Sequence, residues 1–526
     1  MTSPAGSLPG TRPRLLLLAV FVAGLVTLGV ELTASRLLGN VFGTSNLVWA
    51  NIIGLILVYL TAGYFIGGRW ADRSPKASTF YALLTWASFT SGLVPLAARP
   101  VLGLAAQAVE HLDAAVMLGS FASVLVLFSL PVTLLGCVSP FAIRIALRET
   151  GEAGRTSGRM YAVSTMGSIL GTFLPVLWLI PAIGTARTFL ALCLPLMAVG
   201  FVGLWIHDRP RFFRLLWMPI LLLGLSWVAL QGGIKSTAGQ IFETESAYNY
   251  IQVVERDGVR SLLLNEGQGI HSVYAPGMRA TFGTWDFFLA APYWNPPPMP
   301  AVPVARVGIV GLAAGTIARQ YTSVFGPIPI DGWEIDPEIV EVGRRYFDMV
   351  EPNVNVIVAD GRWGLAHSDA FYDVIGVDAY RLPYIPWQLT TQEFFQEVKA
   401  HLSPRGVLVI NVGRTPEDRR IVDAMTGTLQ SVFATVHVVD VPASLNTILY
   451  ASVSATERGY LEENYQILAG QGADPLLVDV LGRTLANLQP TPIVSTVFTD
   501  DKAPIEQLTN SIALRFIFAG DLNILR

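Results

Sequence analysis

The sequence predicts a multi-span α-helical membrane domain, then a small β domain, then an α/β domain with a doubly wound sheet. Three observations predict this order. Hydrophobic residues make up 52% of the 526 residues and charged residues 14%, and the apolar excess is concentrated before residue 235. Short β-rich segments follow from Ser236. From Arg306 onward, apolar strands alternate with helical segments, which is typical of a βαβ sheet.

Residues 1–235 contain seven apolar segments, each close to the ~20 residues that a helix needs to cross a bilayer. These segments are residues 15–37, 47–67, 79–98, 114–138, 160–183, 187–206 and 212–231. Basic residues gather in the loops at 67–76, 144–159 and 207–214. Because basic loops stay in the cytoplasm, these loops are predicted to be cytoplasmic. The chain is therefore predicted to be an integral protein of the plasma (inner) membrane.

Residues 236–300 are predicted to form the small β domain and a spacer. Apolar runs at 251–255 and 259–264 are joined by Arg256-Asp257-Gly258, and Asp-Gly between such runs is a hairpin signal. The proline-rich segment 296–300 is expected to be a stiff extended connection into the next domain.

Residues 301–455 begin with an apolar strand at 306–310 and a turn that contains Gly311 and Gly315. Small residues at a strand-to-helix turn let the backbone approach a ligand. The turn lacks a full G-x-G-x-x-G, so by itself it is a weak signal for a ligand.

Three acidic residues stand at the ends of the next three strands. Glu334 comes 23 residues after Gly311, where a carboxylate can accept both hydroxyls of a ribose. Asp360 and Asp378 follow the third and fourth strands. Because open α/β sheets bind ligands at the carboxyl ends of their strands, these acids predict a nucleoside site.

The remaining segments complete the sheet. They are a helix at 391–402, a strand at 406–412, a helix at 417–433 and a closing strand pair at 435–441 and 447–453. Residues 456–526 are predicted to be a C-terminal helical extension.

The order of these motifs resembles the spermidine synthase (polyamine aminopropyltransferase) family, in the form fused behind a membrane domain of major facilitator type. The most specific shared motifs are Glu334-Ile335-Asp336-Pro337 and Tyr372-Asp373-Val374-Ile375-Gly376-Val377-Asp378. The resemblance covers roughly residues 243–454, and it implies a class I methyltransferase-like (Rossmann-type) sheet. It also implies a small-molecule amine as acceptor and decarboxylated S-adenosylmethionine as cosubstrate, with S-adenosylmethionine as the alternative.

The resemblance implies a role for each of the three acids. Glu334 would hold the ribose hydroxyls and Asp360 would receive the adenine amino group. Asp378 would be the catalytic acid/base residue next to the attacking amine.

The resemblance also implies further contacts outside these motifs. Asn249, in the glutamine position of an entry motif at 245–250, and Gln268 are candidate cofactor contacts. Asp286 and Tyr380 are candidate substrate contacts. Gln268 and Asp286 can equally be ordinary loop residues.

Three positions depart from the family pattern on the side of the amine. Ala314 replaces an acidic residue in the Gly-rich turn, Arg381 replaces a second acid, and Val441 lies where a tyrosine is expected. An arginine beside a dication is repulsive. Two alternatives therefore stay open: an S-adenosylmethionine-dependent methyltransferase, and a non-catalytic nucleoside-binding domain that regulates a small transport-like membrane bundle.

The composition argues against several other functions. A net charge of −4 gives no electrostatic basis for nucleic-acid binding. The two cysteines lie in apolar segments and the six histidines show no ligand spacing, so no metal site is predicted. The predicted partners are the amine and the lipid bilayer, and a homo-oligomer is left open.

The span count and the expected cosubstrate place the soluble domain on opposite sides of the membrane. Seven spans and a cytoplasmic N-terminus put the residues after 235 outside the cytoplasm. Adenosyl sulfonium donors are made in the cytoplasm, however, so an active transferase is expected there. One additional crossing at residues 100–112 would reconcile the two arguments, and on that basis the soluble domain is predicted on the cytoplasmic side.

Overall fold

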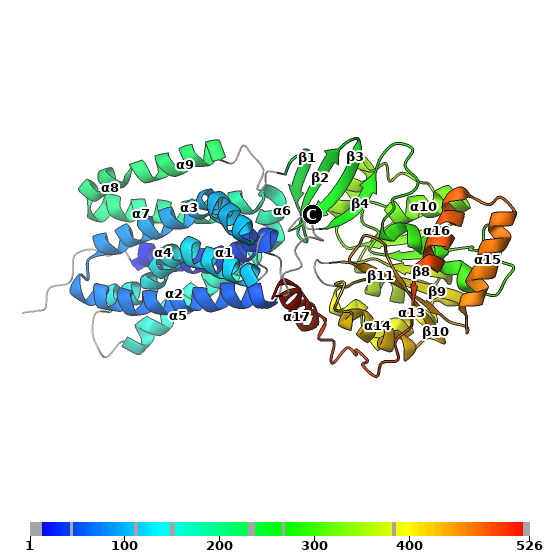
Figure 1. Ribbon diagram of the computed structural model, residues 1–526. Helices are drawn as coiled ribbons and strands as arrows, with labels where there is room; N and C mark the ends of the chain where they lie inside the picture. The colour runs from blue at the N-terminus through cyan, green and yellow to red at the C-terminus, as the bar shows by residue number, and fades with distance from the viewer. Residues whose placement is uncertain are drawn as a thin grey trace, which may run out of the picture. The chain divides into compact units, whose positions relative to one another are not determined.

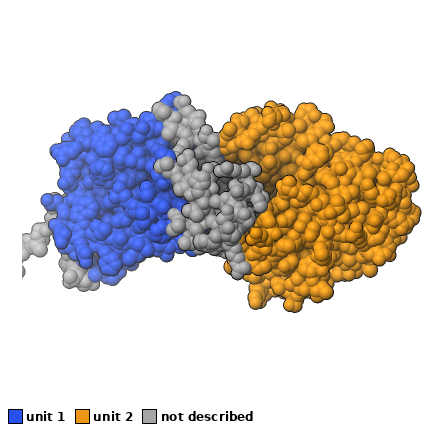
Figure 2. All heavy atoms as spheres, viewed as in Figure 1, with its two compact units in different colours: residues 1–236, 244–250 blue, residues 237–243, 251–526 orange. Residues whose placement is uncertain are grey.

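The computed structural model describes residues 13–42, 46–109, 114–147, 153–229, 237–265, 269–380 and 385–518. Its internal contacts divide the chain into two compact units, coloured separately in Figure 2. The first unit contains Met1–Ser236 and Thr244–Tyr250, and the second contains Thr237–Glu243 and Ile251–Arg526.

The first unit is a bundle of helices (Figure 1). Its longer helices are α1 (Pro13–Phe42), α2 (Asn46–Arg73), α3 (Ala77–Val109), α4 (Ala114–Ala146), α5 (Ala153–Leu174) and α7 (Thr185–His207). Among the described residues, six helical segments are long and apolar enough to cross a membrane. They are Pro13–Gly39, Val48–Arg73, Ala77–Ala98, Gly119–Ala146, Ala153–Ile183 and Thr185–His207.

The seventh predicted span, residues 212–231, falls on two shorter helices. They are α8 (Arg209–Leu215) and α9 (Trp217–Ala229), separated at Leu216. Pro219 explains the break, because its ring lacks an N–H and clashes with the carbonyl four residues earlier, at Leu215.

Glycines bring α1 and α5 into backbone contact. A Cβ on Gly167 would lie 1.9 Å from the Phe21 carbonyl oxygen, and one on Gly171 would lie 2.1 Å from that of Leu25. In the other direction, a Cβ on Gly24 would lie 2.2 Å from the Ser164 oxygen. Small residues at such positions are how membrane helices approach closely.

The small β domain is a four-stranded sheet in the order β1-β2-β3-β4. Its strands are β1 (Gln240–Glu245), β2 (Tyr250–Arg256), β3 (Val259–Leu264) and β4 (Ile270–Tyr274). The hairpin predicted at Asp257-Gly258 is confirmed, since Arg256 pairs with Val259 across the turn. Both turn residues have positive φ, 52° and 79°, as a two-residue type I′ hairpin requires.

The main sheet has eight strands in the order β12-β10-β11-β9-β8-β5-β6-β7. The strands are β5 (Val307–Val310), β6 (Ile330–Glu334), β7 (Val354–Val358), β8 (Tyr372–Val377), β9 (Leu402–Gly413), β10 (Thr435–Asp440), β11 (Asn446–Ser452) and β12 (Leu488–Gln489). β5 to β9 are parallel, and β10 to β12 close one edge in antiparallel order. The strand order reverses at β5, with β6 on one side and β8 on the other, and such a switch point is where doubly wound sheets bind ligands.

Two apolar cores cover the faces of this sheet. One contains the 3-10 helix η3 (Thr284–Trp294), α10 (Thr316–Phe325), α15 (Arg458–Gly470) and α16 (Pro475–Ala486). The other contains α12 (Gly361–Ala366), α13 (Gln392–Ala400), α14 (Arg420–Gln430) and α17 (Ile505–Phe518). The segment predicted as a C-terminal extension thus contributes buried side chains to both cores.

Candidate functional site

The site begins at the turn between β5 and α10. Gly311 has φ +87°, and a Cβ there would lie 2.6 Å from the backbone oxygen of Asp378. The turn therefore passes directly against the end of β8. Gly315, at φ +84°, is the residue before α10 and packs against Met349.

Glu334 is the last residue of β6, and its side chain is buried. Its Oε2 accepts a hydrogen bond from the Ala313 N–H at 2.9 Å, and its Oε1 accepts one from the Asp336 N–H at 3.0 Å. Burial raises the pKa of Glu334 to about 7, although the backbone donors of Asp336 and Ala313 lower it. Each oxygen keeps a lone pair that a ribose hydroxyl could use.

Asp378 directly follows β8 and is partly exposed at the edge of the sheet. Its Oδ2 accepts a hydrogen bond from Trp285 Nε1 and its Oδ1 accepts one from Asn411 Nδ2, both at 3.0 Å. Burial raises the pKa of the Asp378 carboxyl to about 6, while the donors from Asn411 and then Trp285 lower it. The carboxylate is therefore ionised near neutral pH and fixed in orientation.

Asn411 has an unused acceptor beside this carboxylate. Its Nδ2 donates to Asp378, but its Oδ1 is buried and has no hydrogen-bond partner among the described residues. A buried acceptor without a partner is costly, so a donor from a water molecule or a ligand would stabilise this atom. Asn411 was not predicted from the sequence. It is, however, the one polar residue in the apolar run 407–412, and a polar residue within a buried strand can indicate a site.

Asp360 caps the N-terminus of α12, where its Oδ1 accepts a hydrogen bond from the Trp363 N–H at 3.0 Å. It follows β7, which pairs with β6, so it lies at the same carboxyl edge as Glu334. β5 lies between β6 and β8, and the Asp378 N–H donates to the Val310 carbonyl of β5 at 3.0 Å. The three predicted acids thus follow β8, on one side of β5, and β6 and β7, on its other side.

Tyr380 lies close to this group. Its hydroxyl donates to the Asn411 carbonyl oxygen at 3.1 Å. Burial, and then the nearby charge of Asp378, raise the pKa of Tyr380, so the phenol stays protonated.

Asp286 is fully buried and has a different environment. Its carboxylate accepts hydrogen bonds from Thr281 (backbone 2.9 Å, hydroxyl 2.6 Å), from the Phe282 N–H at 3.0 Å and from Gln320. It also pairs with Arg483 of α16 at 2.8 Å. These contacts favour a structural role, tying the entry of η3 to α10 and α16, over the predicted substrate contact.

The other residues named in the sequence analysis have no contact with the three acids among the contacts described above. Asn249 lies in the segment grouped with the first unit, where its N–H donates to Ser246 Oγ at 2.8 Å. Gln268 and Arg381 lie outside the described residues. Ala314 is buried, with its N–H donating to Ser272 Oγ at 3.0 Å, and Val441 is a core residue. Among the described residues there is no group of three side chains that could hold a metal ion.

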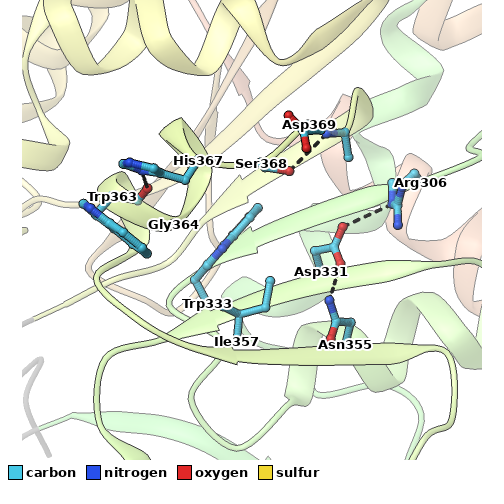
Figure 3. Close-up of a pocket in the computed structure, with 11 residues that line it drawn as sticks. Arg306, Asp331, Trp333, Asn355, Ile357, Trp363, Gly364, His367, Ser368 and Asp369 are labelled. Atoms are coloured by element: carbon cyan, nitrogen blue, oxygen red, sulfur yellow. Dashed lines mark hydrogen bonds and ion pairs between the residues drawn. The ribbon is translucent and has the colours of Figure 1, made fainter.

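A cavity of about 490 Å³ is lined by residues of β6, β7 and α12 (Figure 3). Asp331, near the start of β6, is one lining residue and is held by Arg306 at 3.1 Å and Asn355 at 2.8 Å. Trp363 and His367, stacked with ring centroids 4.2 Å apart, form one side. None of the three predicted acids lines this cavity, so it is distinct from the predicted nucleoside site.

Comparison with known proteins identifies the domain. The family model of the spermine/spermidine synthase domain matches residues 306–461. A probable polyamine aminopropyl transferase of Bifidobacterium longum is 34% identical over 283 residues, which are 51% of this chain and 61% of that protein. A polyamine aminopropyltransferase of Vibrio vulnificus is 28% identical over 261 residues, 46% of this chain and 81% of that protein.

Among solved structures, a probable spermidine synthase from Corynebacterium glutamicum is similar, with 20% identity and a TM-score of 0.36. The similarity covers 49% of this chain and 99% of that one. The residues matched by the family model, 306–461, all lie in the second unit. Behind its apolar helices, the chain therefore carries a spermine/spermidine synthase domain, with relatives named as polyamine aminopropyltransferases.

Proposed function

We propose that the second unit transfers an aminopropyl group from decarboxylated S-adenosylmethionine to an amine. The observation that carries the proposal is the pair of donors, Trp285 and Asn411, that fixes a partly exposed Asp378 at the switch point of the sheet. Glu334 and Asp360, at the ends of the two strands beyond β5, would hold the ribose and the adenine.

The proposed chemistry is a displacement at the carbon next to the sulfonium. The amine nitrogen forms a bond to that carbon, the carbon–sulfur bond breaks, and its electron pair stays on sulfur as methylthioadenosine. The nitrogen loses a proton to Asp378. With a pKa of about 6, the carboxylate is ready to accept that proton at neutral pH.

Asn411 is proposed to hold the attacking amine. Its unpartnered Oδ1 lies on the same amide whose Nδ2 fixes Asp378, so one amine could donate to both residues. By contrast, Ala314 and Val441 offer no side-chain charge for a second ammonium, and Asp286 is already saturated. We therefore expect an acceptor in which one amino group is recognised strongly.

The altered amine side also keeps methyl transfer as a second candidate. In that reaction Asp378 or Tyr380 would orient a nucleophile towards the methyl carbon of S-adenosylmethionine. The two reactions leave different products, because methyl transfer converts the donor into S-adenosylhomocysteine.

Product analysis tests the proposal. Purified full-length protein is incubated with each donor and a panel of monoamines and diamines, and the nucleoside products are separated by mass spectrometry. Methylthioadenosine supports aminopropyl transfer, and S-adenosylhomocysteine would replace it with methyl transfer. A nucleoside that co-purifies but is never converted would favour the regulatory binding domain.

The side of the membrane affects which donor is available. α9 lies along α3, with Trp217 5.1 Å from Phe89 between ring centroids and Leu222 against Gly92. Trp217 and Leu222 follow each other along α9 in the same order as Phe89 and Gly92 along α3, so the two helices run parallel. α9 therefore runs away from the basic turn at 74–76, where α3 begins.

The segment 244–250 makes contacts at that far end of the same unit. Arg36, late in α1, donates to the Tyr248 carbonyl at 2.9 Å, and Thr185, the first residue of α7, donates its N–H to the Glu245 carboxylate. Combined with the positive-inside rule, these contacts support a non-cytoplasmic exit of the chain, opposite to the cytoplasmic side predicted from the sequence. We propose this exit, which would require an adenosyl donor on that side of the membrane.

A further inference from the structure

A second cavity, of about 460 Å³, lies in the membrane unit where the turn between α2 and α3 meets α8. It opens among the basic residues at one end of the bundle. Its polar and aromatic lining consists of Trp70, Ser74, Thr79, Trp86, Arg211 and Arg214.

The two arginines of this cavity differ in how they are paired. Arg211 Nε forms an ion pair with Asp208 at 3.2 Å, one helical turn earlier. Arg214 is exposed and has no ion pair or hydrogen-bond partner among the described residues. The cavity therefore carries excess positive charge, and a guanidinium binds phosphate oxygens in a bidentate manner.

Neutral donors stand beside the cations. Ser74 Oγ and Thr79 Oγ1 lie 3.2 Å apart and share one hydrogen bond, which leaves one hydroxyl proton free to donate elsewhere. Trp70 and Trp86 are 38% and 41% exposed. Half-exposed indoles beside arginines are typical of the depth at which lipid head groups lie.

We propose that this cavity binds the phosphate head group of an anionic phospholipid. Ala82, Leu83 and Leu215 give it apolar walls, which a free phosphate ion would not use. Along α9, Ile220 and Leu221 are exposed and offer a path for acyl chains. The proposal rests on the membrane placement of the first unit and is independent of the reaction in the second.

Native mass spectrometry of the purified full-length protein tests the site. Detergent micelles are doped with phosphatidylglycerol or phosphatidylcholine, and retained lipid and thermal stability are both measured. The variants are Arg214→Gln and Arg211→Gln/Arg214→Gln. The matched control is Arg159→Gln, which removes an exposed arginine from α5, outside the cavity.

Wild type and Arg159→Gln are expected to retain phosphatidylglycerol in preference to phosphatidylcholine. Arg214→Gln is expected to weaken that binding about fivefold and the double variant further, since each basic residue near a head group contributes ~1 kcal/mol, or about fivefold. Because Arg214 is exposed, its replacement leaves the fold intact.

Three outcomes would overturn the lipid site. Equal retention of phosphatidylcholine would remove the role of charge, and unchanged binding by Arg214→Gln would place the lipid elsewhere. Stabilisation by millimolar inorganic phosphate alone, with displacement of the lipid, would make this a site for a soluble anion. A protein that fractionates away from membranes would instead refute the membrane placement.

Discussion

At the scale of single residues, the site depends on one carboxylate held by two distant donors. Trp285 and Asn411 are separated from Asp378 by 93 and 33 positions in the chain. Sequence motifs predicted the acids because each directly follows an apolar strand. They could not predict the donors, since periodicity places a residue on an element but does not choose its partner across the fold.

Replacing the carboxylate separates binding from chemistry. Asp378→Asn should keep adenosyl binding and reduce turnover about a hundredfold or more, because an amide cannot accept the proton. Calorimetry and single-turnover rates measure the two effects. Asp369→Asn is the control, since that carboxylate is exposed and lines the cavity that none of the three predicted acids lines. Full activity in Asp378→Asn would remove the residue from the mechanism.

The pH profile distinguishes the two donors. Activity requires ionised Asp378, so turnover should rise with pH through about 6. Trp285→Phe removes a donor that favours ionised Asp378, so the pKa of Asp378 should rise. The increase in turnover should then occur at higher pH, with little change in the KM for the amine. Asn411→Leu should move this increase in the same direction and also raise that KM. Equal KM effects in both variants would contradict the proposed contact of Asn411 with the amine.

Glu334 predicts a second dependence on pH, this time in ligand binding. Its pKa of about 7 in the free protein should fall when ribose hydroxyls donate to the carboxylate, so binding releases a proton. Affinity should therefore increase as pH rises towards 7, by at most tenfold per unit, and level off above it. Glu334→Gln should bind more than about tenfold more weakly, without this dependence on pH. Calorimetry at several pH values measures both, and pH-independent binding by wild type would refute the ribose assignment.

At the scale of elements, prediction succeeded where burial and turn chemistry agree. Residues 372–377 were predicted and found as a strand, and Asp257-Gly258 as a hairpin turn. The single span predicted at residues 212–231 corresponds to two helices, because apolar composition reports length but not the break that Pro219 causes. Residues 456–526 were predicted as an extension, and α15 and α16 within them supply part of the core of the sheet.

The Gly311 turn offers a test with a matched control. Gly311→Ala should lower the free energy of unfolding by about 2–5 kcal/mol, because a positive φ and a contact with the Asp378 backbone both oppose a Cβ. Gly258→Ala shares the positive φ, but its Cβ would have no heavy atom within 4 Å, so only about 1–2 kcal/mol is expected. Denaturant titrations of the second unit compare the two, and equal losses would contradict the close approach.

At the scale of the whole molecule, two units share one chain. The number of times the first unit crosses the membrane therefore decides on which side of the membrane the second unit lies. A reporter fused after Arg526 tests that path: a phosphatase active only outside the cytoplasm, and a protein that fluoresces only within it. The contacts of α9 and of residues 244–250 lead us to expect phosphatase activity without fluorescence. The reverse result would restore the cytoplasmic placement and refute the proposed exit.

The interlocked glycines of α1 and α5 limit how the first unit can move. With backbone touching backbone at Gly24, Gly167 and Gly171, the two helices have no side-chain layer along which one could slide past the other. They should behave as one rigid body. Any rocking motion within the bundle would have to occur between other helices, and a cross-link between α1 and α5 should leave that motion unchanged.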